Sequence, residues 1–128
     1  MPALYLDSSA IVKLVVAEPE SSALRAFLKD YPVRASSLLA RVEVKRAVRG
    51  RGPHVLARAE ATLERLHLLH LDEPLLEAAA AIGPPVLRTL DAIHLASAQT
   101  LGETIVVTYD TRMAEASTSL GIRTLAPR

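Results

Sequence analysis

The sequence has no cysteine and no tryptophan, and only three tyrosines and one phenylalanine among its 128 residues. Without cysteine there are no disulfides, no thiolate nucleophile and no cysteine zinc sites, which fits a reducing compartment, and we expect a cytoplasmic protein. With so few aromatic side chains, the protein has few platforms on which single-stranded bases could stack. Since 50% of the residues are hydrophobic, the core must be built from aliphatic side chains.

Long apolar runs and an excess of charge are missing as well. No segment approaches the ~18 apolar residues that a membrane-spanning helix needs. The first residues, Met-Pro-Ala-Leu, lack the basic region of a signal peptide, and we expect no membrane partner. The formal net charge of +1 gives no overall field that attracts nucleic acid. The length fits one domain, which we place over residues 1–128.

Strand-like and helix-like segments alternate along the chain. Strands are predicted at residues 3–7, 33–36, 67–71, 104–108 and 122–125. Helices are predicted at residues 10–17, 20–29, 38–49, 55–66, 73–82, 86 or 87 to 101, and 113–120. Ser8 or Ser9 is the expected cap of the first helix. The alternation predicts an α/β fold in which a central parallel sheet of four to five strands carries helices on both faces.

Four acidic residues occupy strongly patterned positions. Asp7 and Asp110 each end a strand-like apolar run, whereas Glu43 and Asp91 each lie inside an apolar helical pattern. Ligands of open α/β sheets bind outside the carboxyl ends of the strands, where Asp7 and Asp110 fall. The two helical acids could lean over the same edge, although spacing alone does not show it. Because converging carboxylates repel one another, the pattern favours a hard divalent cation suited to phosphoryl chemistry.

Other chemistries fit these residues less well. His94 shares a helical face with Asp91, but no second nitrogen ligand lies nearby, so we expect a packed or hydrogen-bonded histidine rather than a zinc ligand. A phosphoacceptor receiver domain requires paired acids after the first strand, where Asp7 is followed by two serines. A nucleotide-binding loop is excluded because the chain has no Gly-x-x-x-x-Gly-Lys-Ser/Thr.

Several polar residues are candidates for contact with a phosphate-bearing substrate. Arg41, Lys45 and Arg49 share one helix face, which is either a solvated surface or a track for a phosphate backbone. Ser8 and Thr108 each have two interpretations. The side chain forms either a local hydrogen bond to the backbone, or a hydrogen bond to the acidic site or to a phosphate. The full set of candidate substrate contacts is Ser8, Arg88, Thr89, Thr108, Arg41, Lys45 and Arg49.

Four stretches together resemble one known family. They are residues 6–10 with Lys13, residues 36–38 leading to 42–44, residues 87–96, and residues 106–113. In order and rough spacing they resemble PIN-domain proteins, most closely the VapC-type toxin ribonucleases of bacterial toxin–antitoxin pairs. The resemblance implies a three-layer α/β/α PIN fold, metal-dependent RNA cleavage with Mg²⁺ (or Mn²⁺ in its place), a homodimer and a cognate VapB-like antitoxin.

The resemblance also assigns roles to the acids. Asp7 and Asp91 are the expected direct or water-mediated metal ligands. Glu43 and Asp110 complete the catalytic pocket and are further candidate metal ligands. Some relatives place a further acid shortly after the fourth one. Here Arg112 and Met113 follow, which puts a second metal ion in doubt. The alternative is a non-catalytic PIN-like module that binds RNA or protein.

An antitoxin needs a docking surface, and the first two predicted helices are unusually apolar. We predict that an amphipathic helix of the partner docks on them and that a basic side chain of the partner enters the acidic pocket. The residues expected to form this surface are Ile11, Leu14, Val15, Leu24, Phe27 and Leu28.

Overall fold

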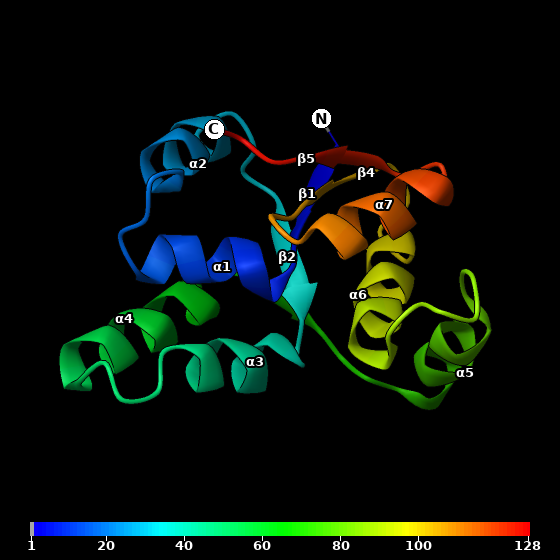
Figure 1. Cartoon of the computed structure of the whole chain (residues 1–128), viewed down its shortest axis with the longest axis horizontal. Coiled ribbons are helices and arrows are strands. Elements are labelled where there is room, and N and C mark those ends of the chain that lie inside the picture. The colour runs from blue at the N-terminus through cyan, green and yellow to red at the C-terminus, as the bar shows by residue number, and fades with distance from the viewer. Residues whose placement is uncertain (1) are drawn as a thin grey trace.

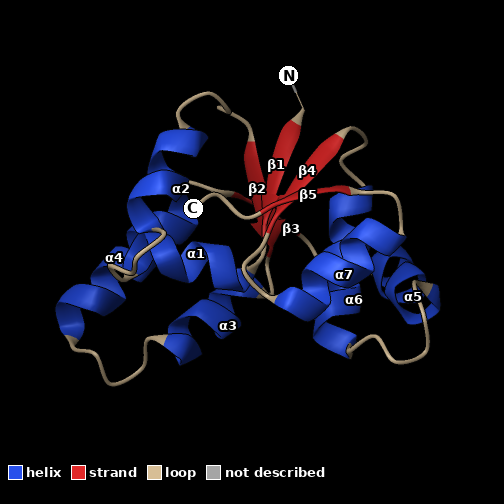
Figure 2. Ribbon diagram, turned by 45° about the horizontal axis from the view of Figure 1, so that its top comes forward, coloured by secondary structure: helices blue, strands red, loops and turns tan. Residues whose placement is uncertain are grey.

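A computed structural model describes residues 2–128 and contains a parallel sheet of five strands in the order β3-β2-β1-β4-β5. The strands are β1 (Ala3–Leu6), β2 (Arg34–Ser37), β3 (His67–Leu69), β4 (Thr104–Val107) and β5 (Arg123–Leu125). The helices are α1 (Ser8–Val15), α2 (Ser21–Leu28), α3 (Ala40–Ala47), α4 (Pro53–Glu64), α5 (Glu73–Ala81), α6 (Thr89–Gln99) and α7 (Thr111–Ser119). Helices α1 to α4 lie on one side of the sheet and α5 to α7 on the other (Figures 1 and 2). The predicted three-layer α/β/α fold is therefore confirmed.

The central strands are apolar on both sides because helices cover both faces of the sheet. In β1, Leu4 and Leu6 pack in the cluster that α1, α3 and α4 share, while Tyr5 packs in a second cluster with Leu95 of α6. This alternation is the two-residue period of an extended chain. Each fully buried Leu of this kind contributes roughly 1.5–3 kcal/mol through removal from water.

The register of β1 and β4 brings their carboxyl ends level. Leu6 pairs with Val107, and the Asp7 backbone N–H donates to the Val107 carbonyl at 3.2 Å. The residues that follow these neighbouring strands therefore leave the sheet at the same edge. This is the edge at which parallel α/β sheets bind ligands.

Five helices, α1, α3, α4, α6 and α7, begin two or three residues away from their predicted starts, and hydrogen bonds explain the difference at α1 and α6. Helix α1 begins at Ser8, and its cap is Asp7, whose Oδ1 accepts a hydrogen bond from the Ala10 backbone N–H at 3.1 Å. The carboxylate of the residue that ends β1 thus takes the position that we predicted for a serine. Helix α6 begins at Thr89, because residues 84–87 form a turn in which the Leu87 N–H donates to the Pro84 carbonyl at 3.0 Å.

Four of the six residues predicted to form a docking surface on the first two helices do not lie at the surface. Ile11, Val15, Leu24 and Leu28 are buried in the core between these helices and the sheet. Leu14 and Phe27 are partly buried and pack against the same cluster. The apolar side chains of α1 and α2 pack in the core, because α1 contacts α2, α3 and α4 at the same time.

Within residues 2–128, none of the helices combines the length and the apolar character needed to cross a membrane.

Candidate active site

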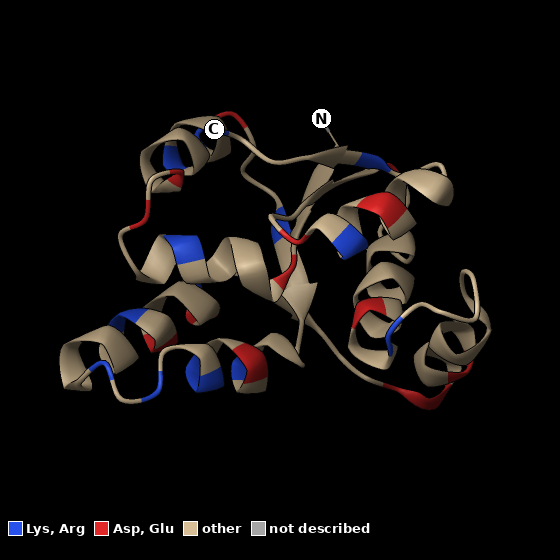
Figure 3. Cartoon of the chain, in the orientation of Figure 1, with Lys and Arg blue, Asp and Glu red and all other residues tan. Residues whose placement is uncertain are grey.

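The four predicted acids line one pocket at the carboxyl edge of the sheet. Asp7 follows β1, Asp110 lies just beyond β4 at the start of α7, and Glu43 and Asp91 come from α3 and α6. The pocket has a volume of about 270 Å³, and we call it the carboxylate pocket; its lining is Asp7, Ser8, Ser9, Val12, Glu43, Ala47, Asp91, His94 and Asp110. Acidic segments of α3, of α6 and of the strand ends surround the centre of the molecule in Figure 3.

Asp7 is buried and held by three donors. Its Oδ1 accepts hydrogen bonds from the Ser9 hydroxyl at 2.6 Å and from the Ala10 N–H at 3.1 Å, and its Oδ2 accepts one from the Thr108 hydroxyl. Burial raises the pKa of Asp7 above its usual range, although these hydrogen bonds and the nearby His94 act in the opposite direction. The three donors therefore offset part of the cost of placing a carboxylate here.

Glu43 is aligned by a hydrogen-bonded chain that starts in the core. The buried Tyr5 hydroxyl lies 2.6 Å from His94 Nδ1, and His94 Nε2 lies 2.6 Å from Glu43 Oε1. The Ser8 hydroxyl donates to the same Oε1 at 2.6 Å. Burial alone would raise the pKa of Glu43, but the hydrogen bonds from His94 and Ser8 outweigh it, so the pKa is lowered and the carboxylate stays ionised. The expectation that His94 is a packed, hydrogen-bonded residue is confirmed.

Asp91 and Asp110 have more open surroundings. The pKa of Asp91 is raised by partial burial and then by the negative charge of Asp110, with smaller contributions of the same sign from Asp7 and Glu43. No side-chain hydrogen bond joins the Asp91 carboxylate to another of residues 2–128. Asp110 is exposed, and its Oδ1 accepts from the N–H groups of Arg112 and Met113. The mutual repulsion is the electrostatic signature of converging carboxylates.

A hard cation fits the chemistry of these donors, since carboxylate oxygens are the ligands that Mg²⁺ prefers. Among residues 2–128, no three His, Cys, Asp or Glu side chains are arranged as a ready metal cluster. Mg²⁺ commonly keeps several of its waters and needs only one or two carboxylates in contact. The donor set is thus compatible with a largely hydrated ion held beside Asp91, whose carboxylate has no competing hydrogen bond.

The predicted substrate contacts are distributed unevenly around the site. The hydroxyls of Ser8 and Thr108 donate to Glu43 and Asp7, so these residues support the carboxylates. Arg41 and Lys45 both bind Glu60 of α4, each at 2.6 Å, while Arg49 is exposed beyond the end of α3. The predicted basic track is therefore partly neutralised by a residue that sequence spacing did not connect with it.

Arg88 and Thr89, at the start of α6, point to different places. Arg88 lines a second and larger pocket next to Asp91, which we call the arginine pocket. Thr89 lines a separate hollow between α5 and α6 and is not brought to the carboxylates.

Sequence reasoning missed three residues that the structure brings to the site. Ser9 donates to Asp7 and accepts from the Tyr109 backbone N–H at 2.9 Å, which ties α1 to the end of β4. Tyr5 and Arg112 were not assigned any role. The alternation of β1 could have identified Tyr5, because it places a phenol on the face of the sheet that carries α6. Nothing in the sequence links Arg112 to Arg88.

Comparisons with known proteins point to one family. The model of the PIN domain matches residues 4–118. The chain is 50% identical to ribonuclease VapC46 of Mycobacterium tuberculosis over 129 residues, covering 99% of both chains. It is 42% identical to ribonuclease VapC35 of the same species over 130 residues, covering 97% of this chain and 96% of the relative.

Solved structures show the same fold. The crystal structure of M. tuberculosis VapC20, a toxin that cleaves the sarcin-ricin loop, superposes with a TM-score of 0.76 at 16% identity and covers 98% of this chain and 100% of its own. A chain of a toxin–antitoxin complex from Klebsiella pneumoniae superposes with a TM-score of 0.73 at 22% identity and covers 98% of each chain.

Proposed function

This chain belongs to the PIN-domain family and, within it, to the VapC-type toxins, and from that premise we propose that it is an endoribonuclease that hydrolyses RNA phosphodiester bonds in the carboxylate pocket. The observation that carries the proposal is the convergence of Asp7, Glu43, Asp91 and Asp110 from four elements on one pocket. Asp7 and Asp110 also cap α1 and α7, but the mutual repulsion of four carboxylates at the ligand-binding edge of the sheet does not stabilise the fold, and within residues 2–128 Asp91 gains no side-chain hydrogen bond there.

We propose Mg²⁺, with Mn²⁺ as a substitute, as the cofactor of this site. Asp7 and Asp91 would hold it, directly or through water, with Glu43 and Asp110 beside them. When bound, such an ion lowers the pKa of a coordinated water and screens the charge that develops on phosphate oxygens.

The chain's own residues prepare the site for this chemistry. Glu43 remains ionised because His94 and Ser8 donate to its carboxylate, and it is therefore the candidate to orient the attacking water and accept its proton. Tyr5, which contacts the opposite nitrogen of His94, limits rotation of the imidazole. Ser9 and Thr108 keep the Asp7 carboxylate in one orientation.

The test is cleavage of labelled single-stranded RNA by purified protein with Mg²⁺, with Mn²⁺ and with EDTA. We expect cleavage with either metal, none with EDTA, and none from Asp91→Asn under any condition. A variant with an unrelated acid removed, Asp30→Asn, is the matched control because Asp30 is exposed beyond the end of α2 and does not line the carboxylate pocket. Metal-independent RNA binding without cleavage would support the non-catalytic module instead.

Membership of the toxin family extends the proposal to partners and compartment. We propose a VapB-like protein antitoxin that restrains the nuclease, a homodimer as the assembled form, and a cytoplasmic location, where both the RNA and the antitoxin are made. Copurification with the antitoxin and light scattering of the complex and of the free chain test the first two of these.

A further inference from the structure

We propose that the arginine pocket binds the nucleotide that adjoins the scissile phosphate of the RNA, with a phosphate between Arg88 and Arg112 and the base against the apolar wall. The inference rests on the proposed ribonuclease function and adds to it the place where the substrate strand is held. It is carried by three features of the pocket: its position, its unpaired guanidinium groups and its apolar lining.

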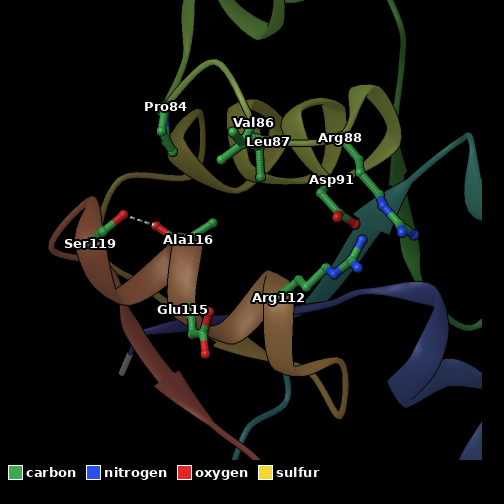
Figure 4. A pocket seen from close by; sticks show the side chains of 9 residues that line it. All are labelled: Pro84, Val86, Leu87, Arg88, Asp91, Arg112, Glu115, Ala116 and Ser119. Carbon is green, nitrogen blue, oxygen red and sulfur yellow. Dashed lines mark hydrogen bonds between the residues drawn. The ribbon is translucent and has the colours of Figure 1, made fainter.

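The position connects the pocket with the site of chemistry. The arginine pocket has a volume of about 570 Å³, within the range of pockets that take small organic ligands. One wall is the turn at residues 84–87 with the start of α6, and the other is α7 (Figure 4). Asp91 lines both this pocket and the carboxylate pocket. A strand whose phosphate lies at Asp91 can therefore pass its next nucleotide directly into the arginine pocket.

The charges favour an anion at the end of the pocket that is near Asp91. Arg88 extends from the α6 side and Arg112 from α7, and the two guanidinium groups approach one another beside Asp91 in Figure 4. Neither forms a salt bridge within residues 2–128, unlike Arg41, which is paired with Glu60. Both arginines are exposed, and the Asp91 carboxylate lies beside their guanidinium groups in Figure 4. A phosphate that enters between the two guanidinium groups can accept bidentate hydrogen bonds from each of them.

The remaining lining suits a base better than a second phosphate. Val86 is 87% exposed on the turn, which is unusual for a large aliphatic side chain, and Leu87 and Ala116 continue the apolar surface. Among the residues that the structure describes, no aromatic side chain lines the pocket, so a base would rest on aliphatic groups and on the plane of a guanidinium, which stacks on bases in RNA-binding proteins. Glu115 and Ser119 offer polar atoms at the far end.

The phosphate contact is tested by RNA affinity in EDTA, where cleavage is prevented. The probe is a fluorescein-labelled 12-nucleotide single-stranded RNA, and the proteins are the parent, Arg88→Ala, Arg112→Ala, the double variant and Arg58→Ala. Each pocket variant should lose affinity about 10-fold, as expected for a hydrogen-bonded charged contact. The double variant should also lower the slope of log affinity against log salt by about 0.7, the value for one phosphate on a single strand, and each single variant by less, because the other arginine still contacts that phosphate.

The double variant distinguishes one shared phosphate from two separate ones. If both arginines hold the same phosphate, the loss in the double variant is smaller than the product of the single losses, because the sites are coupled. Arg58, an exposed arginine on α4, controls for the general loss of one positive charge and should stay within about twofold of the parent. Affinities of Arg88→Ala and Arg112→Ala within twofold of the parent overturn the proposal.

The base contact is tested with small ligands by NMR. Nucleoside 5′-monophosphates should shift the backbone amides of residues 86–88 and 112–116 and bind about 10-fold more tightly than ribose 5-phosphate. Val86→Asp should abolish that difference and leave the protein folded, since Val86 is 87% exposed. Equal affinity for the nucleotides and ribose 5-phosphate in the parent protein shows that the apolar wall holds no base.

Failure of the pocket and failure of the nuclease are separable. If the parent cleaves RNA with Mg²⁺ or Mn²⁺ and Asp91→Asn does not, the nuclease stands, and the arginine variants decide the pocket alone. If the parent cleaves no RNA with either metal while both arginine variants still lose RNA affinity, the nuclease is wrong and the pocket remains an RNA-binding site.

Discussion

His94 and Glu43, which are 51 residues apart in the sequence, are joined by a hydrogen bond of 2.6 Å between Nε2 and Oε1. Its geometry depends on Tyr5, whose hydroxyl contacts the other ring nitrogen. Since the ionised Glu43 carboxylate can only accept, Nε2 carries the proton that points at it, and in the neutral imidazole Nδ1 is then the acceptor for the Tyr5 hydroxyl. A residue inside the core of the sheet thus determines the direction of a carboxylate in the proposed active site.

Loss of the hydrogen bonds from Tyr5 through His94 to Glu43 should reduce cleavage, although no carboxylate is removed. We expect His94→Ala to lower the cleavage rate about 10- to 100-fold, the range seen when a group that orients a catalytic ligand is removed. Tyr5→Phe keeps the ring and should have a smaller effect of the same sign. The measurement is the single-turnover cleavage rate, with urea unfolding of both variants as a control for folding. An unchanged rate in a folded His94→Ala protein would show that Glu43 needs no orientation.

Removal of the Asp91 charge should stabilise the protein while it stops cleavage. The pKa of Asp91 is raised in the folded state, so folding becomes less favourable as pH rises through the interval between its unfolded and folded values. At neutral pH the ionised Asp91 is therefore a net cost, and Asp91→Asn should raise the free energy of unfolding by a few tenths to about 1 kcal/mol after allowance for solvent screening. Urea denaturation at pH 7 measures this difference.

Glu43→Gln is the matched comparison because the pKa of Glu43 is lowered in the folded protein, whereas that of Asp91 is raised. The pKa of Glu43 is lowered, so its contribution to stability is present above the unfolded pKa and is lost as pH falls through the folded one. Glu43→Gln should therefore be neutral to destabilising at pH 7. The same sign of change in both variants would contradict the assignment of repulsion to Asp91 and of hydrogen-bond stabilisation to Glu43.

The donors to Asp7 should matter to both stability and activity. Thr108→Val removes a hydroxyl that donates to the buried Asp7 carboxylate, which we expect to cost about 1–3 kcal/mol of unfolding free energy. It should also raise the pKa of Asp7 further and move the acidic limb of the cleavage profile to higher pH. Thr108→Ser, which keeps the hydroxyl, should retain most of both properties. Thermal unfolding and a pH series of cleavage rates provide the measurements.

Metal binding should be visible in stability as well as in activity. If Mg²⁺ or Mn²⁺ relieves the repulsion among the carboxylates, millimolar metal raises the thermal midpoint of the parent protein, because a ligand of the folded state stabilises it. The increase should be absent in Asp91→Asn and preserved in Asp30→Asn. Equal increases in all three proteins would place the metal outside the carboxylate pocket.

Removal of the ion pairs that Glu60 forms with Arg41 and Lys45 of α3 should strengthen RNA binding. Glu60 binds both Arg41 and Lys45, so Glu60→Gln should increase affinity for single-stranded RNA and steepen its salt dependence if this helix face follows the RNA backbone. Arg41→Ala in the Glu60→Gln protein should reverse the gain. Unchanged affinity in Glu60→Gln shows that the face is only a solvated surface.

Several features could be predicted from the sequence because they depend on local patterns. The alternation of apolar runs and helical periods predicted the parallel sheet and its covering helices, and the runs before Asp7 and Asp110 placed both acids at strand ends. The ends of the helices were less accurate. The cap of α1 is Asp7 rather than the predicted serine, and α6 begins later than predicted because residues 84–87 form a turn. Both features depend on hydrogen bonds that the pattern of apolar residues does not record.

Other features were decided only when the elements packed. Glu43 and Asp91 reach the carboxylate pocket because α3 and α6 lie on opposite sides of the sheet and lean over the same edge, and no spacing along the chain encodes that approach. Packing also buried the apolar residues of α1 and α2 that had suggested a docking surface, and it paired Arg41 with Glu60. It likewise brought Arg88 and Arg112 to one pocket. Sequence periodicity reports which face of an element is apolar, but the neighbour of that face is set by the tertiary fold.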